Sequence, residues 1–312
     1  MEPSGLRGRI ERQHLALICL AALVALAGCA GGTSDGTPTE TPANTTTPVE
    51  NGTSLPTEAS IDNFSAGEGL DGDVTPAEDL SVSGEQVVGD ALAAIEGVES
   101  YRLTGDSTVR SRTNNVDQTQ EIQRVTRVDR ERPALSVNST IRAQGRTIEQ
   151  EDYYVDGTLY RYNPFLVSEY GSEWIKRNIS ENFTQILSDA DRLSLYRNVM
   201  ENGTATLEGA QTVDGERTYR VRVRTSGDAA AGVLNLGETN GSDAELVTTF
   251  WVDANDSTVV RAEGAVEILT TRRGQTAVVS GTFVETLTYG GVEVTLPEAA
   301  STAVDPTAGT TN

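Results

Sequence analysis

Apolar residues recur with two different periods along most of the chain. Over long stretches they occupy every second position, as where Tyr219, Val221 and Val223 alternate with arginines. This period is typical of a β-strand that buries one face and exposes the other. Because such runs dominate the chain after about residue 97, we expect a domain built mainly from half-buried antiparallel strands.

A smaller part of the chain has helical periodicity. Ser83 and Gln86 form a capping-box pattern before an apolar run that stops at Gly97, which predicts an amphipathic helix. Between about 181 and 201, apolar residues recur at three- and four-residue steps, which predicts a second, longer helix. A short third helix is expected over 228–236.

These patterns together predict a fold class. Asp156-Gly157 and Asp214-Gly215 lie between alternating runs, and both residue types tolerate the positive φ of tight hairpin turns. We therefore expect one α+β domain over residues 83–298, with a curved, mostly antiparallel β-sheet (half-barrel) covered on one face by two or three helices. Incomplete cover would leave an apolar hollow.

The first 28 residues have the pattern of a secretory signal peptide. Three arginines precede an uninterrupted apolar run, Leu15–Ala27, which is too short to cross about 30 Å of hydrocarbon as a helix. The run ends in Leu26-Ala27-Gly28-Cys29, which resembles the lipobox of exported lipoproteins. We expect lipidation of Cys29, the alternative being a buried helix with a chance cysteine. Both the general secretory and the twin-arginine route stay open.

Two segments outside the expected domain have little apolar surface. Residues 29–82 are rich in Thr, Pro, Gly, Ser and acids and contain no basic residue, so we expect a disordered acidic tether. A random coil of this length reaches roughly 40 Å, which would lift the domain clear of a membrane. Residues 299–312 are expected to form a disordered tail.

The charge of the chain excludes one class of partner. The net charge is -22, from 46 acidic and 24 basic residues, and Lys176 is the one lysine among them. This is the composition of a halophilic protein, because molar salt screens the repulsion between carboxylates. Nucleic acid is not an expected partner, since its binding requires basic residues gathered against phosphates.

The distribution of reactive side chains argues against catalysis. The single histidine, His14, and both cysteines, Cys19 and Cys29, lie in the first 29 residues. A disulfide framework, a Cys/His zinc site and a Ser-His-Asp triad are therefore excluded from the rest of the chain. Acid pairs for glycoside hydrolysis remain open, but no pair stands out. We expect no enzymatic activity, no cofactor and no metal.

Asn-x-Ser/Thr sequons are more frequent than composition explains. There are nine, where chance gives roughly three. The excess is typical of an exported glycoprotein, and Asn182 is close enough to Asn178 that we expect only one of the two to carry a glycan. The expected glycosylation sites are Asn44, Asn51, Asn63, Asn138, Asn178, Asn202, Asn240 and Asn255.

Three short segments resemble a known family. Together with the lipobox, tether and leading helix, residues Tyr153–Tyr160 (YYVDGTLY), Gly171–Lys176 (GSEWIK) and Phe250–Asp253 (FWVD) resemble lipoproteins with the half-barrel fold of the LolA carriers and of mycobacterial LppX and LprG. The resemblance covers roughly residues 83–297. It implies a cavity between sheet and helices that holds acyl chains. In a haloarchaeal protein the lipids on offer would be isoprenoid ether lipids instead. It implies no catalytic residue.

Aromatic residues concentrate in one part of the chain. Seven of the 16 lie between Tyr153 and Trp174, and tyrosine and tryptophan suit the mouth of a cavity. The alternative is that these aromatic residues form ordinary hairpin core. The predicted helix 181–201 would be either a movable cover over the cavity or a helix simply packed on the sheet. The expected ligand-binding residues are Tyr154, Tyr160, Tyr162, Phe165, Trp174, Phe183, Leu187 and Leu193.

Two further patterns concern ions. Arg220, Arg222 and Arg224 share one strand face, where they would bind an anionic head group or pair with cross-strand carboxylates. The second pattern, 253–257 (DANDS), places oxygen-bearing residues at alternate positions, as calcium loops do, but lacks the central glycine and terminal glutamate.

These observations predict a lipoprotein on the extracellular face of the cell membrane, anchored through Cys29, that binds or carries a hydrophobic, lipid-like ligand. The alternative is a cell-envelope interaction protein without a ligand cavity, with surface-layer proteins among its partners.

Overall fold

The structure is a computed structural model that describes residues 61, 64–67, 70, 73–113, 116–234, 236, 243–272 and 275–307. The chain divides into two compact units, Met1–Asn63 and Phe64–Asn312, and the description below concerns the second. The expected signal peptide, the lipidation site Cys29 and four sequons lie outside the described residues: Asn44, Asn51, Asn63 and Asn240.

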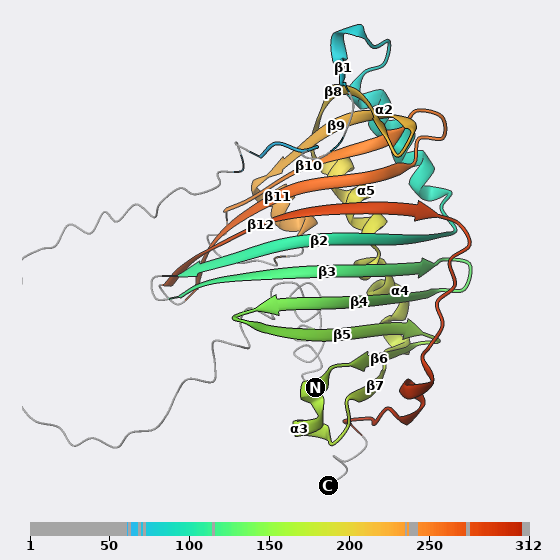
Figure 1. Cartoon of the computed structure of the whole chain (residues 1–312), viewed down its shortest axis with the longest axis vertical. Coiled ribbons are helices and arrows are strands. Elements are labelled where there is room, and N and C mark those ends of the chain that lie inside the picture. Colours follow the sequence, from blue (N-terminus) through green and yellow to red (C-terminus); the bar gives the residue numbers. More distant parts are fainter. Residues whose placement is uncertain are drawn as a thin grey trace, which may run out of the picture. The chain divides into compact units, whose positions relative to one another are not determined.

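The unit from Phe64 onward is built on one antiparallel sheet of 12 strands (Figure 1). Most neighbours are consecutive hairpins, but β12 pairs with β2, which brings the last strand to the middle of the sheet. The order is β1-β8-β9-β10-β11-β12-β2-β3-β4-β5-β6-β7. The strands are β1 (Thr75–Pro76), β2 (Ser100–Thr113), β3 (Asp117–Asp129), β4 (Ala134–Ala143), β5 (Arg146–Val155), β6 (Thr158–Tyr162), β7 (Trp174–Asn178), β8 (Thr204–Val213), β9 (Glu216–Ser226), β10 (Asp243–Asp253), β11 (Val259–Arg272) and β12 (Gln275–Tyr289).

The helices are short and, except for η5, lie between strands in the sequence. Within the described residues, none of them combines the length and the apolar character needed to cross a membrane. The α-helices are α2 (Gly84–Glu96), α3 (Val167–Tyr170), α4 (Phe183–Ala190), α5 (Arg192–Asn202) and α6 (Gly227–Val233), and the 3-10 helices are η2 (Ala77–Asp79), η3 (Pro164–Leu166), η4 (Ser180–Asn182) and η5 (Glu298–Thr302).

Local sequence signals place several of these boundaries. The capping box at the start of α2 is confirmed, since Ser83 accepts a hydrogen bond from the backbone of Gln86 and the Gln86 side chain accepts one from the backbone of Ser83. The hairpin turns at Asp156 and Asp214 are confirmed as well, with φ of 50° and 51°. Each is followed by a glycine that also has positive φ, so both residues of each turn have the backbone conformation that a tight hairpin requires.

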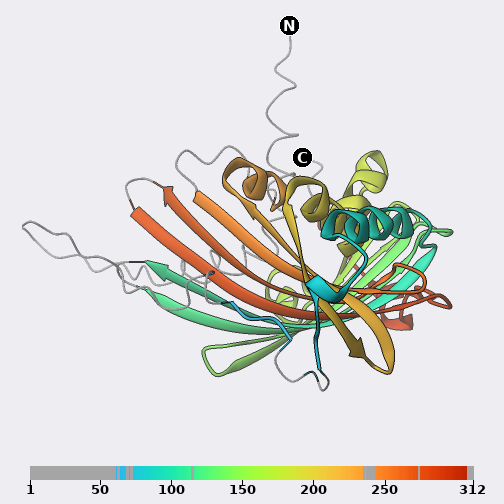
Figure 2. The ribbon, with the colours of Figure 1, turned by 90° about the horizontal axis from the view of Figure 1, so that it is seen from above.

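The expected fold class is wrong in its layer of helices. The sheet is antiparallel and curved, as expected (Figure 2), but the described residues contain five α-helices rather than two or three. These helices do not cover a face of the sheet. Helices α2, α5 and α6 pack chiefly against β8, β9 and β10, and helix α4 contacts β4. Short helices cannot cover 12 strands, so most of the sheet is without a helical layer.

We call the side of the sheet on which the helices pack the inner face, and the opposite side the outer face. The inner face holds Tyr101, Leu103, Leu135, Val221 and Phe250, each with no solvent exposure. The Tyr196 ring of α5 meets Phe250 edge-on at 5.2 Å between centroids. The main apolar core therefore lies between the inner face and the helices.

The outer face is covered at two places by segments from the ends of the folded unit. Trp251 is fully buried there beneath Phe64, Ala66 and Leu70, and the guanidinium groups of Arg220 and Arg261 lie 5.7 and 5.8 Å from its rings. Phe64, Ala66 and Leu70 therefore contact the sheet, although they come before residue 83, where the domain was expected to start.

A second outer-face cluster lies near β7. Tyr153 and Trp174 pack with Ala300 and Ala303 of the C-terminal segment, and Val304 forms a parallel bridge with Ile175. Ala300, Ala303 and Val304 therefore contact the sheet, although they come after residue 298, where the domain was expected to end.

A glycine makes room for an aromatic ring in the middle of the inner face. Gly264 pairs with Phe283 across β11 and β12. A Cβ at Gly264 would lie 2.4 Å from the Phe283 ring and 2.7 Å from a backbone oxygen. The ring can lie against the sheet only because this position has no side chain.

We expect Gly264→Ala to lower the free energy of unfolding by about 1–3 kcal/mol, the usual cost of overpacking a core. The matched control is Gly89→Ala on α2, where an added Cβ has nothing within 4 Å. That change should raise stability by roughly 0.5–1 kcal/mol, because alanine favours a helix over glycine. Chemical denaturation of both variants measures the difference, and equal effects would contradict the packing of Phe283 on Gly264.

Candidate functional site

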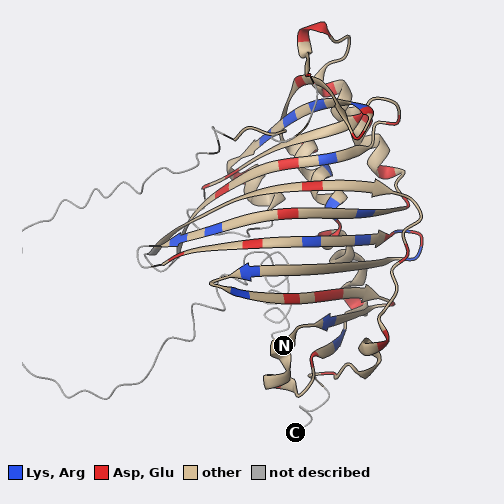
Figure 3. Ribbon diagram, in the orientation of Figure 1, with Lys and Arg blue, Asp and Glu red and all other residues tan. Residues whose placement is uncertain are grey.

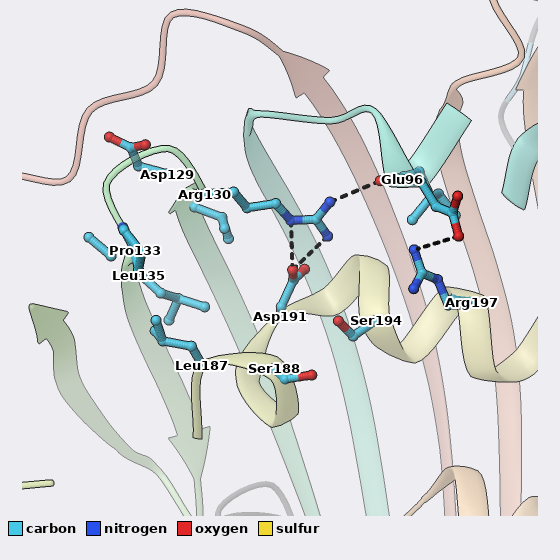
Figure 4. A pocket seen from close by; sticks show the side chains of 13 residues that line it. Glu96, Asp129, Arg130, Pro133, Leu135, Leu187, Ser188, Asp191, Ser194 and Arg197 are labelled. Carbon is cyan, nitrogen blue, oxygen red and sulfur yellow. Dashed lines mark hydrogen bonds and ion pairs between the residues drawn. The ribbon is translucent and has the colours of Figure 1, made fainter. Parts of the chain in front are cut away.

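A pocket of about 470 Å³ opens between the β3–β4 hairpin and helices α2, α4 and α5 (Figure 4). Pockets that bind small molecules range from about 300 to 1,000 Å³. The residues that line it are Ile95, Glu96, Val128, Asp129, Arg130, Pro133, Ala134, Leu135, Leu187, Ser188, Asp191, Ser194 and Arg197.

The pocket is amphipathic, and the hairpin and the helices each contribute both apolar and charged groups. Val128 and Leu135 come from the inner face of β3 and β4, where they pair across the two strands. Leu187 of α4 points toward Leu135, while Arg130 and Arg197 lie toward α2 (Figure 4). A ligand here would meet apolar groups where α4 approaches β4 and charged groups where the hairpin approaches α2.

Asp191 fixes the helices that form this pocket. It separates α4 from α5 and accepts a hydrogen bond from the backbone of Leu193 at 2.9 Å, which caps α5. The Tyr101 hydroxyl donates to the same carboxylate at 2.6 Å, and Arg130 pairs with it at 2.6 Å. Arg130 also donates to the carbonyl of Ile95 at 2.9 Å, at the end of α2. One carboxylate therefore joins α5, β2 and the hairpin arginine that caps α2.

A second buried acid anchors α5 to the centre of the sheet. Glu285 of β12 is 5% exposed, and it pairs with Arg192 at 2.8 Å and accepts a hydrogen bond from Tyr196 at 2.5 Å. The Arg192 guanidinium also lies 5.2 Å from the centre of the Phe283 ring. These contacts hold the first turn of α5 over β12.

The tyrosines of both networks are held neutral. Burial raises the pKa of Tyr101 well above its usual value, and the neighbouring Asp191 carboxylate raises it further. The pKa of Tyr196 is raised in the same way, by burial first and by Glu285 second. Both hydroxyls therefore remain hydrogen-bond donors to their carboxylates at neutral pH.

The expected ligand-binding residues fall at different places in this structure. Leu187 is the one that lines the pocket. Tyr154 is buried on the inner face beside Leu135, Leu193 is fully buried in α5, and Phe183 is half-buried on α4. Their role in ligand binding stays a prediction.

The other four expected residues lie away from the pocket. Tyr160, Tyr162 and Trp174 pack together with Tyr153 on the outer face, under the C-terminal segment. The Tyr162 and Trp174 rings are 5.4 Å apart. Phe165 is 55% exposed. The aromatic cluster that the sequence shows is therefore mostly hairpin core on the opposite side of the sheet from α4.

Sequence reasoning missed the groups that build the pocket. Arg130 lies in the turn between β3 and β4, and Asp191 lies inside a segment with continuous helical periodicity. The aspartate was the available signal, because this residue type favours the start of a helix over its middle. It breaks the expected helix 181–201 into α4 and α5.

The arginine ladder on β9 pairs with carboxylates of neighbouring strands. Arg220 lies 2.7 Å from Glu208 and Arg222 lies 3.8 Å from the same residue, while Arg224 pairs with Glu245. Cross-strand pairing thus accounts for the ladder better than an anion site.

The acidic turn between β10 and β11 uses its oxygens for the turn itself. Asp253 accepts hydrogen bonds from the backbones of Asn255 and Asp256 at 2.7 and 3.2 Å. Among the described residues, no group of three or more acidic, histidine or cysteine side chains is arranged to hold a metal ion.

The described sequons differ in accessibility. Asn178, Asn202 and Asn255 are exposed, as is Asn182. Asn138 is half-buried, and its Oδ1 atom is buried without a hydrogen-bond partner. Occupancy of each site stays a prediction.

Comparison with known proteins yields distant structural similarities. No protein-family model and no curated protein matches the chain. The chain is similar to the crystal structure of the Mycobacterium tuberculosis lipoprotein LppX, at 15% identity and a TM-score of 0.39 over 68% of this chain and 97% of that one. It is also similar to the crystal structure of LprF from Mycobacterium bovis, at 15% identity and a TM-score of 0.39 over 72% of this chain and 99% of that one. A DUF1329 family protein from Desulfovibrio piger has 12% identity and a TM-score of 0.24, over 72% and 96%.

We expect Asp191→Ala to lower the free energy of unfolding by about 3 kcal/mol, because it leaves the partly buried Arg130 unpaired and removes the cap of α5. The control is Arg132→Ala, whose pair with Glu293 joins side chains that are 80% and 71% exposed and should contribute less than about 1 kcal/mol. Denaturant titration of both variants tests this. A loss below about 1 kcal/mol for Asp191→Ala would contradict its anchoring role.

Proposed function

We propose that the protein is a membrane-anchored extracellular lipoprotein that binds a hydrophobic, lipid-like ligand without catalysis. The observation that carries the proposal is the amphipathic pocket between the β3–β4 hairpin and helices α2, α4 and α5. Its volume of about 470 Å³ lies in the range of pockets for small molecules.

The chemistry of the pocket supports an amphiphile. Leu187 and Pro133 offer apolar contact above the buried side chains of Ile95, Val128 and Leu135. Each buried methylene of a ligand chain would contribute about 0.8 kcal/mol. Ser188 and Ser194 lie on the helical side together with Arg197, so a polar head group would find donors there.

The way the pocket is built supports a ligand site over incidental surface. Its polar frame is anchored by Asp191 and Arg130, whose charges compensate each other at 2.6 Å. Because these groups are already satisfied, a ligand would not need to displace a buried pair. A preformed site of this kind loses less entropy on binding than a flexible one.

The amino-terminal sequence supports the proposed location. An arginine-rich start, a short apolar run and Cys29 in a lipobox-like tetrapeptide follow one another in the order of an exported lipoprotein. The long acidic segment after Cys29 would separate the folded unit from the membrane.

A single leucine tests the ligand site. We expect the full chain, purified at high salt, to bind the environment-sensitive dye N-phenyl-1-naphthylamine and to release lipid on solvent extraction, measured by fluorescence titration and mass spectrometry. Leu187→Trp should weaken dye binding at least tenfold, because the larger ring fills the pocket beside Leu135.

The matched control is Leu269→Trp, the same change at a residue of β11 that is 39% exposed and does not line the pocket. It should bind the dye like the unchanged protein. Equal affinity of the two variants, or no dye binding and no extracted lipid, would refute ligand binding at this pocket.

A second function, contact with envelope proteins through the exterior, is favoured by the segment between β6 and β7. Phe165, Val167 and Tyr170 are 55%, 46% and 36% exposed, and they lie within six residues of one another on η3 and α3. A cluster of exposed apolar side chains is typical of an interaction surface. Surface-layer proteins are the proposed partners in this case.

The double variant Phe165→Ser and Val167→Ser separates the two functions. It should bind the dye normally, because neither residue lines the pocket. If it also loses co-sedimentation with isolated cell envelopes, while the unchanged protein shows no lipid, the second function replaces the first.

A further inference from the structure

The helical side of the pocket beside α4 carries three hydrogen-bond donors. Ser188 lies on α4, and Ser194 and Arg197 lie on α5. Asp191, Ser194 and Arg197 follow one another at three-residue steps, which places each beside the next along α5. Figure 4 shows Ser194 between Asp191 and Arg197. A head group that lies against α5 would therefore meet these donors together.

The two serine hydroxyls are not used inside the protein. Among the described residues, neither the Ser188 nor the Ser194 hydroxyl has a hydrogen-bond partner. Ser188 is exposed and Ser194 is half-buried. A serine hydroxyl carries one donor, so both side chains can donate to a ligand without breaking a contact of the fold.

Arg197 is held only loosely. Within the described part of the chain its one ion pair is with Glu96, at an N–O distance of 3.8 Å between side chains that are 36% and 72% exposed. This distance is longer than a hydrogen bond, and exposed pairs of this kind contribute little to stability. The guanidinium of Arg197 therefore keeps its N–H groups for a ligand.

The other arginine of the pocket is already engaged. Arg130 pairs with Asp191 at 2.6 Å and donates to the carbonyl of Ile95 at 2.9 Å. Asp191 also accepts a hydrogen bond from the Tyr101 hydroxyl. Because the charges of Arg130 and Asp191 compensate each other, Arg197 is the cation that would decide how the pocket treats a charged head group.

Two further carboxylates line the pocket and would oppose an anion. Asp129 accepts a hydrogen bond from the backbone of Arg132 at 2.9 Å, and it points away from Ser194 in Figure 4. The Glu96 side chain is 72% exposed, so water can solvate its charge when an anion replaces it beside Arg197. Neither carboxylate therefore closes the space between Ser194 and Arg197.

The rest of the sheet does not set the sign of the ligand's charge. Acidic and basic positions are interspersed along the strands (Figure 3), so their fields largely cancel at a distance, and salt screens what remains. The choice of head group depends on the donors that touch it.

An oxyanion uses these donors well. A guanidinium binds phosphate or sulfate through two parallel charge-assisted hydrogen bonds, and a serine hydroxyl donates to another oxygen. Leu187 and Pro133 would contact the apolar chain of the same ligand. We propose that the pocket takes an anionic amphiphile, whose phosphate or sulfate group binds Arg197 and Ser194. This inference rests on the proposed lipid-binding function and names the chemical class of its ligand.

Two matched pairs of amphiphiles test the class of ligand. Oleoyl lysophosphatidic acid and monooleoylglycerol differ by the phosphate, and oleyl sulfate and oleyl alcohol differ by the sulfate. Each is titrated, below its micelle concentration, against the full chain carrying N-phenyl-1-naphthylamine, and displacement of the dye is measured by fluorescence. We expect the charged member of at least one pair to displace the dye at a concentration about tenfold lower or less, because it forms charge-assisted hydrogen bonds.

Three variants assign the preference to named side chains. Arg197→Gln should reduce the tenfold preference to about threefold or less, because an amide cannot form the charged fork. Ser194→Ala should reduce it severalfold. Glu96→Gln should increase it severalfold, because the competing carboxylate is gone. The control is Arg102→Gln, which removes the same charge at an exposed residue of β2 that does not line the pocket, and its preference should be unchanged.

The outcomes separate this inference from the function on which it rests. Equal displacement by the charged and neutral members of both pairs would overturn the anionic ligand, as would a preference that survives Arg197→Gln. Stronger displacement by oleylamine would overturn it too, because an ammonium group would use Glu96 and Asp129 instead. In these three cases dye and amphiphile still bind, so the lipid-binding function stands. Absence of dye binding would refute both.

Discussion

The junction between α4 and α5 depends on two buried ion pairs. After β7, at one edge of the sheet, the chain must return to β8 near the opposite edge, and α4 and α5 make that crossing on the inner face. Asp191 with Arg130 and Arg192 with Glu285 fix the crossing at adjacent residues. Because each carboxylate is paired with an arginine and also accepts a hydrogen bond from a tyrosine, the networks satisfy groups that would otherwise be costly to bury. They determine where the helices lie, and hence where a pocket remains.

The same pairs explain why the helical layer is incomplete. A continuous amphipathic helix over 181–201 could have lain along the apolar inner face. The cap at Asp191 instead starts a new helix whose first turn is held over β12 by Glu285. The remaining helices pack near β8–β10, so the pocket forms at the boundary between covered and uncovered sheet.

The two faces of the sheet offer different chemistry. The inner face contributes Val128 and Leu135 to an amphipathic pocket, whereas the outer face over β2–β5 carries a polar groove around Asn138. This division follows from the period of a strand, since successive side chains point to opposite faces.

The sequence by itself determined the local elements and the antiparallel hairpins. The capping box at Ser83, the Asp-Gly turns and the period-two strands depend on neighbours within a few residues, so local patterns were sufficient to predict them. Sequence reasoning did not give the helix break at Asp191, the position of the aromatic cluster on the outer face, or the pocket around Arg130. Tertiary structure decided these, because the partners of Asp191 are 61 and 90 residues away in the chain, and only the folded sheet brings such distant charges together.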